Sequence, residues 1–65
     1  MKQTLRAARI NAGYRSAAAA AEKLGVTELT LWNYERGKTS PTADVICKMV
    51  ETYGVSFDDI DFFRH

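Results

Sequence analysis

The sequence has little of several features that mark large classes of proteins. Its 65 residues include one cysteine, so no internal disulfide can form, and no cluster of Cys and His has the spacing of a zinc site. No apolar run reaches the roughly 18 residues of a membrane helix, and no signal-peptide pattern is present. We therefore expect a cytoplasmic protein with no contact to a membrane and no metal or other cofactor.

A catalytic pair is also missing. His65 stands at the terminus, Cys47 has no base near it in the sequence, and no other nucleophile is spaced for activation by a base. The sequence therefore predicts that the chain is not an enzyme.

The length and the charge distribution narrow the classes of protein that remain possible. A chain of 65 residues makes one domain, residues 1–65, and an apolar content of 46% favours a compact fold over disorder. The net charge is only +1, but residues 1–38 hold seven Lys/Arg and three Glu (+4), whereas residues 39–65 hold two Lys/Arg and five Asp/Glu (−3). The first half is the better candidate for a surface that faces phosphates, the alternative being an ordinary mixed surface.

Glycine and small hydroxyl residues divide the chain into helical segments. Gly13, Gly25, Gly37 and Gly54 follow periodic segments, as helix C-caps do. Hydroxyl residues expected at N-caps precede the next segments: Ser16, Thr27, Thr42 and Ser56. No alternating strand pattern appears, so the sequence predicts an all-α fold of five helices. The predicted helices are residues 2–12, 17–24, 28–36, 43–53 and 57–61.

The join between the second and third predicted helices is the most informative feature. Leu24 ends one helix, Gly25 turns the chain and Thr27 caps the next helix. A turn of about three or four residues with a glycine is typical of a helix-turn-helix motif, although other helical hairpins share it.

Two charged residues lie on helix faces that are otherwise apolar. Arg9 lies on the stripe that Leu5 and Ala8 form, and Glu35 comes four residues after Leu31. Opposite charges on two buried stripes favour an ion pair, the alternative being that both side chains reach solvent. The predicted core is Leu5, Ala8, Ala20, Leu24, Val26, Leu31, Tyr34, Ile46, Met49, Val50, Tyr53, Val55, Phe57 and Ile60.

The outward face of the third predicted helix carries groups that can read base pairs. Asn33 can form two hydrogen bonds with adenine, Leu29 or Trp32 can contact a thymine methyl, and Glu28 can accept from cytosine. Each of these residues could instead be an ordinary solvated side chain. Trp32 and Leu29 together, however, make an exposed apolar patch that favours a partner, either DNA or protein.

Three stretches carry a resemblance to a known family: LRAAR at residues 5–9, EKLGVTELTLWNYERGKTSP at 22–41 and ETYGVSFDDI at 51–60. Residues 5–60 resemble the lambdoid phage repressor and Cro type of helix-turn-helix domain, which also occurs in prophage regulators and some antitoxins. The resemblance implies that residues 17–24 lie over the DNA backbone, that residues 28–36 enter the major groove, and that Arg9 and Glu35 form a structural ion pair.

The resemblance also implies which residues hold phosphates and what the chain does. The implied phosphate contacts are Arg15, Ser16, Ala17, Arg36, Lys38, Thr39 and Ser40. Ala17 stands where the family usually has Gln, and Trp32 where a small or polar residue is usual. The expected function is that of a sequence-specific DNA-binding transcriptional regulator acting as a repressor. The alternative is a protein-interaction module on the same fold, an antitoxin or anti-repressor partner, that uses Trp32 and Leu29.

Related regulators bind double-stranded DNA as homodimers, so a homodimer is expected here, in solution or only on DNA. Phe57, Phe62 and Phe63 beside the acidic C-terminal run are the candidate dimer surface. The alternative is that Phe57 belongs to the core and that the tail is frayed.

Overall fold

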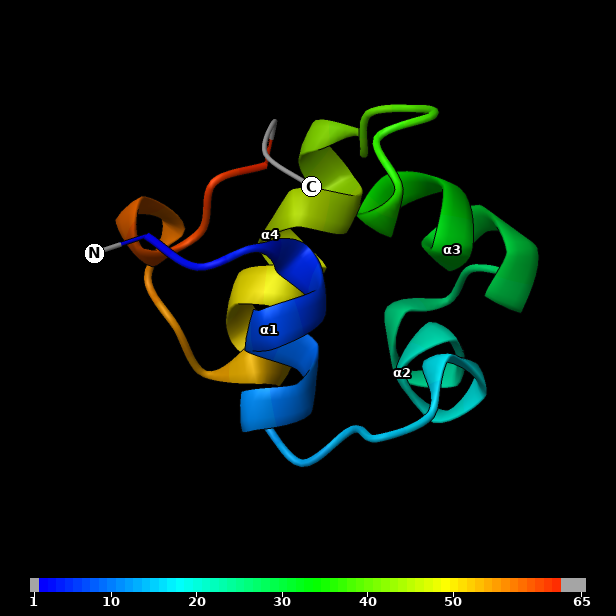
Figure 1. Cartoon of the computed structure of the whole chain (residues 1–65), viewed down its shortest axis with the longest axis horizontal. Coiled ribbons are helices and arrows are strands. Elements are labelled where there is room, and N and C mark those ends of the chain that lie inside the picture. The colour runs from blue at the N-terminus through cyan, green and yellow to red at the C-terminus, as the bar shows by residue number, and fades with distance from the viewer. Residues whose placement is uncertain (1, 63–65) are drawn as a thin grey trace.

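The computed structural model describes residues 2–62, and these form four α-helices and one short 3₁₀ turn (Figure 1). The elements are α1 (Leu5–Asn11), α2 (Ala17–Leu24), α3 (Glu28–Glu35), α4 (Ala43–Tyr53) and the 3₁₀ turn η1 (Phe57–Asp59). In Figure 1, α1 and α4 occupy the centre, α2 and α3 form one side, and η1 lies on the opposite side near the N-terminus. None of the helices in the described chain is long and apolar enough to cross a membrane.

Hydroxyl side chains fix where the helices begin. Ser16, Thr27 and Thr42 each accept a hydrogen bond from the main-chain N–H three residues on, at 3.2, 3.1 and 3.4 Å. This is the N-cap geometry expected of these residues, and it satisfies a donor that has no partner within the helix. The predicted bounds of α2 and α4 are therefore confirmed, and α3 ends one residue earlier than predicted.

The first helix is shorter than the predicted residues 2–12. Thr4 Oγ1 accepts from Ala7 N–H at 3.1 Å, so Thr4 is the N-cap and α1 begins at Leu5. Gln3 before it is extended and makes an isolated parallel bridge to Ile60. Its N–H donates to Asp59 O and its carbonyl accepts from Asp61 N–H, both at 2.9 Å. The N-terminal residues thus pair with the distant C-terminal segment instead of adding a turn to α1.

The predicted fifth helix, residues 57–61, is wrong, and so is the count of five helices. Only Phe57–Asp59 is helical, and it forms one 3₁₀ turn. Asp59 N–H donates to Ser56 O at 3.0 Å, and Ser56 N–H donates back to Asp59 Oδ2 at 3.1 Å. Ile60 is already extended, with φ −115° and ψ 133°. Continuing the helix would break the main-chain bonds to Gln3, which explains why the segment stops there.

The core lies where the four helices meet, and α2 packs against both α3 and α4. Small side chains on α2 allow this close approach. The buried apolar side chains are Leu5, Ala8, Ala17, Ala20, Ala21, Leu24, Leu31, Tyr34, Met49, Tyr53, Ile60 and Phe62. Val26, Ile46 and Val55 are partly buried against this core, and Val50 is half-buried.

One aromatic residue predicted for the core lies outside it. Phe57 is 58% exposed, whereas Phe62 is buried, and the two ring centroids lie 5.2 Å apart. Because η1 ends after one turn, the chain reaches the core with Ile60 and Phe62 instead of with Phe57.

Tyr53 gives a prediction for alkaline stability. Its buried hydroxyl has no hydrogen-bond partner within residues 2–62. The pKa of Tyr53 is raised from 10.0 to about 12, chiefly by burial and also by the nearby Glu35 carboxylate, while Arg9 opposes both. The native state therefore favours the neutral phenol, and its contribution to stability is complete below pH 10 and lost as the pH rises toward 12.

We expect Tyr53→Phe to leave stability at pH 7 unchanged or raise it by up to about 1 kcal/mol, because an unpaired buried polar group is removed. Urea unfolding of both proteins at pH 7 and at several values from 9 to about 11.5 tests this. The variant should lose less stability than the parent in the alkaline range. An identical alkaline loss in the two proteins would show that Tyr53 is not the group responsible.

Candidate nucleic-acid interface

The turn between α2 and α3 is formed by three residues, 25–27. Gly25 adopts the left-handed conformation, with φ +73°, and its N–H donates to the carbonyls of the last turn of α2. Val26 N–H donates to Ala21 O at 3.1 Å, and Thr27 then caps α3. A residue with a Cβ is strained at such a φ, so Gly25 is what permits a turn this short. The result is two contacting helices, visible side by side in Figure 1.

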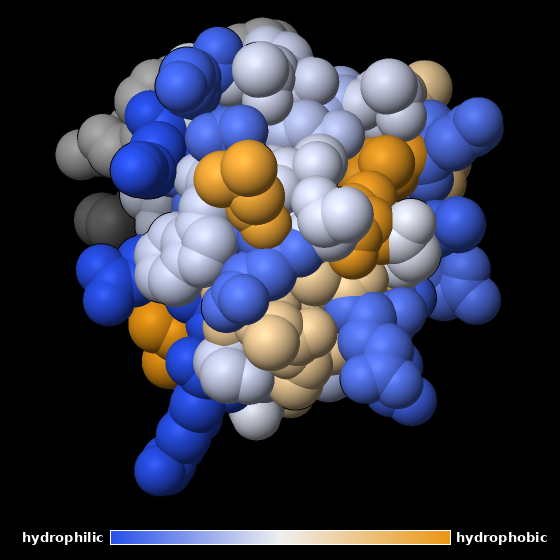
Figure 2. Space-filling view, turned by 90° about the vertical axis from the view of Figure 1, so that its right-hand side faces the viewer, coloured by the Kyte–Doolittle hydropathy of each residue, from blue (hydrophilic) through white to orange (hydrophobic). Residues whose placement is uncertain are grey.

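The outward face of α3 offers free polar and apolar groups. Leu29 is 68% exposed and Trp32 is 40% exposed, although both are large and apolar. Glu28 is also exposed and Asn33 is half-buried. The Asn33 side chain forms no hydrogen bond within the described residues, so both its donor and its acceptor are free. Figure 2 views the molecule from the side of α2 and α3, where hydrophobic side chains form separate islands among hydrophilic ones.

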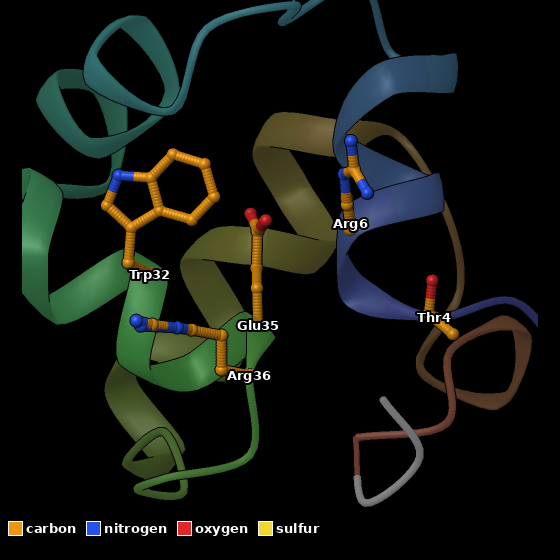
Figure 3. A pocket seen from close by; sticks show the side chains of 5 residues that line it. All are labelled: Thr4, Arg6, Trp32, Glu35 and Arg36. Carbon is orange, nitrogen blue, oxygen red and sulfur yellow. The ribbon is translucent and has the colours of Figure 1, made fainter.

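Trp32 lies beside a cleft between α1 and α3. The cleft has a volume of about 450 Å³ and is lined by Thr4, Arg6, Trp32, Glu35 and Arg36. Figure 3 shows the indole on the α3 side, Arg6 on the α1 side and the Glu35 carboxylate between them. Neither Thr4 nor Arg6 was among the site residues predicted from the sequence. Arg6 precedes Arg9 by three residues, and that helical spacing places the two arginines on neighbouring parts of one face.

A buried ion pair joins α1 to α3. Arg9 Nε donates to Glu35 Oε2 at 2.8 Å, and Arg9 Nη2 donates to Glu35 Oε1 at 3.3 Å. Each side chain is 3% exposed. Arg9 Nη1 donates in addition to the carbonyls of Tyr14 and Arg15, at 2.9 and 3.0 Å. The guanidinium therefore fixes the loop before α2 relative to α3, a role that the sequence did not indicate.

The residues expected to hold phosphates lie at the start of α2 and in the loops before α2 and after α3. Arg15 and Ser16 are exposed in the loop before α2. The Ala17 side chain is buried, so only its main-chain N–H could meet a phosphate. The remaining four, all exposed at the C-cap of α3 and in the loop after it, are Arg36, Lys38, Thr39 and Ser40.

The loop after α3 is anchored to that helix by its main chain. The Asn33 carbonyl accepts from Lys38 N–H at 2.9 Å and from Thr39 N–H at 3.4 Å. These bonds satisfy the Asn33 carbonyl near the end of the helix. The loop thus has a set position relative to the exposed face of α3.

A short glycine turn between two contacting helices, with free side chains on the outward face of the second, defines a helix-turn-helix domain, a class of fold that binds DNA. Residues 3–63 match the helix-turn-helix domain family, and the chain belongs to this family. Comparison with curated proteins and with solved structures gave no significant match.

Proposed function

We propose that this chain is a sequence-specific DNA-binding transcriptional regulator, a cytoplasmic repressor of the lambdoid repressor and Cro type found in prophages. The observation that carries the proposal is the outward face of α3, which lies between two loops with exposed cations and offers two exposed apolar side chains and an amide that forms no hydrogen bond within residues 2–62. In this proposal α3 enters the major groove, which admits an α-helix and displays a distinct pattern for each base pair. The proposed base contacts are Glu28, Leu29, Trp32 and Asn33.

The two loops would position α3 without reading sequence. Arg15 and Lys38 are exposed and form no ion pair within the described residues 2–62. Phosphate contacts from such cations set the register and orientation of a protein on the duplex. Ser16 Oγ accepts from Ala19 N–H, so its hydroxyl hydrogen is free to donate to a phosphate. The proposed phosphate contacts are Arg15, Ser16, the Ala17 N–H, Arg36, Lys38, Thr39 and Ser40.

The size of the chain supports a homodimer on DNA as part of this proposal. The longest dimension of the molecule is 28 Å, shorter than the roughly 34 Å between half-sites one helical turn apart. One chain therefore reads one half-site, and two chains are needed for a palindromic operator. Phe57 is exposed and available for the dimer contact, whereas Phe62 is buried in its own core and Phe63 lies outside the described residues.

Selection of bound sequences from a random duplex library tests the proposal. A repressor of this type should enrich one inverted repeat whose half-sites are about one turn apart. Retention of every sequence alike, or of none, would contradict sequence-specific binding.

A substitution in the loop after α3 should change the salt dependence of binding. Lys38→Ala removes one phosphate contact, so it should weaken binding to specific and scrambled duplexes equally and lower the salt slope by about 1. Fluorescence anisotropy with both duplexes at four salt concentrations measures both effects. Lys2→Ala, at an exposed position before α1, is the matched control and should leave the slope unchanged. A loss confined to the specific duplex would remove Lys38 from the phosphate contacts.

The second candidate function is a protein-interaction module, an antitoxin or anti-repressor partner. The observation in its favour is the exposure of Leu29 and Trp32 on one helix. An apolar protein interface depends little on salt, whereas DNA binding by counterion release weakens steeply with it. The same salt series therefore separates the two functions.

A further inference from the structure

The cleft between α1 and α3 has the size of a small-ligand site. Its volume of about 450 Å³ falls within the roughly 300–1,000 Å³ typical of such sites. Two helices form its walls, and the side chain of Glu35 rises between them (Figure 3). A small molecule in this cleft would contact α1 and α3 at the same time.

The charges around the cleft favour an anion. Both Glu35 oxygens accept hydrogen bonds from Arg9, so the carboxylate and that guanidinium form a neutral pair. Arg6 and Arg36 have no acidic partner and no hydrogen bond in the part of the chain that the structure describes. The lining therefore carries two positive charges beyond the neutral pair. A charge-assisted hydrogen bond from an arginine to a carboxylate is stronger than one between neutral groups.

The shape of the lining favours a flat ring. The indole of Trp32 forms the α3 wall of the cleft and stays 40% exposed, although burial of an aromatic face is favourable. Arg6 lies across the cleft from it, while Arg36 extends along α3 away from Arg6 (Figure 3). A ligand that carries one acidic group on one planar ring would therefore contact both walls.

We propose that this cleft binds a planar aromatic anion, with the ring against Trp32 and the acidic group on Arg6. Neither helix-turn-helix geometry nor the DNA contacts proposed above require such a ligand. Trp32 and Arg36 belong to α3, so an occupied cleft changes the surface of that helix. The ligand is thus placed to act as an effector.

The single tryptophan of the chain makes the site directly observable. The indole N–H of the full ¹⁵N-labelled chain gives one NMR cross-peak, which is followed during titration with benzoate, benzamide and cyclohexanecarboxylate. Benzoate should shift the cross-peak saturably. The neutral ring and the non-aromatic acid should each bind at least about fivefold more weakly, because each lacks one of the two contacts.

Arg6→Gln tests the anion contact. It should raise the Kd for benzoate about tenfold, the effect of one hydrogen bond to a charged group. Lys23→Gln on α2 removes an exposed cation that does not line the cleft and should leave the Kd unchanged. A circular dichroism spectrum like that of the parent shows that each variant is folded.

Three outcomes would overturn the proposal: no saturable shift with benzoate, equal shifts with benzoate and benzamide, or a Kd unaffected by Arg6→Gln. Loss of duplex binding in Arg6→Gln without any benzoate shift would instead assign Arg6 to a DNA phosphate. The readout needs no DNA, so failure of the ligand proposal and failure of the proposed function are distinguished.

Discussion

Removing Arg9 or Glu35 alone is expected to lower the free energy of unfolding by about 3–5 kcal/mol. The two side chains are 3% exposed and joined by hydrogen bonds of 2.8 and 3.3 Å. Arg9→Ala leaves a buried carboxylate without its partner, and Glu35→Ala leaves a buried guanidinium. The domain is small, so a loss of this size is a large fraction of its total stability. Urea unfolding followed by circular dichroism measures it.

The double variant distinguishes the interaction between the two side chains from the separate effect of removing each one. Because the second substitution removes the charge that the first leaves behind, the double variant should be more stable than the sum of the two losses predicts. Strictly additive losses would show that the two side chains do not interact in solution. Arg6→Ala, an exposed arginine one turn away on α1, is the matched control and should cost less than about 0.5 kcal/mol.

The two single variants should also differ from each other. Arg9 Nη1 donates to the carbonyls of Tyr14 and Arg15, so Arg9→Ala releases the loop before α2 as well as the ion pair. Glu35→Ala leaves both of these loop contacts possible. Amide hydrogen exchange should therefore rise in residues 14–19 more strongly in Arg9→Ala than in Glu35→Ala.

The sequence predicts α2, α3 and α4 well because their signals are local. Each of the three has a hydroxyl residue at its start, and α2 and α4 also have an apolar face of helical period. Thr4 before Leu5 is the same kind of signal, and it could have placed the start of α1 correctly. Gly25 directly follows the second predicted helix, and this single residue is likewise enough to predict the turn.

The C-terminal segment could not be predicted in this way because its structure depends on distant residues. The main-chain bonds between Gln3 and residues 59–61 end η1 after one turn. No local pattern around Phe57 reports the position of Gln3. The interpretation of Phe57 as a core residue failed for this reason, and Phe62 takes a place in the core instead.

Only those features of the candidate site that depend on helical spacing within α3 could be predicted from the sequence. Spacing alone places Leu29, Trp32 and Asn33 on the outward side of α3. It does not show that Trp32 lies beside a cleft with Arg6 on its other wall, because that depends on how α1 packs against α3. The contacts of Arg9 with the loop carbonyls depend on the same packing.

Asn33→Ala is expected to reduce discrimination between the specific duplex and one changed at a single base pair by about 5- to 150-fold. Its amide forms no hydrogen bond within the part of the chain that the structure describes. A bidentate contact with adenine contributes roughly 1–3 kcal/mol of discrimination, with 1.4 kcal/mol for each factor of ten. Affinity for scrambled DNA should stay nearly constant, because the side chain holds no phosphate in this proposal.

The substitution should leave the fold intact, so a loss of specificity can be assigned to the contact itself. Alanine is a better helix former than asparagine, and the bonds from Lys38 and Thr39 reach the Asn33 carbonyl, which alanine retains. Anisotropy titrations against the selected operator, its single-base variants and a scrambled duplex measure the change. An unfolding midpoint equal to that of the parent verifies the fold. If Asn33→Ala weakens all duplexes by the same factor, the side chain does not read a base, and direct recognition on α3 must be assigned to other residues.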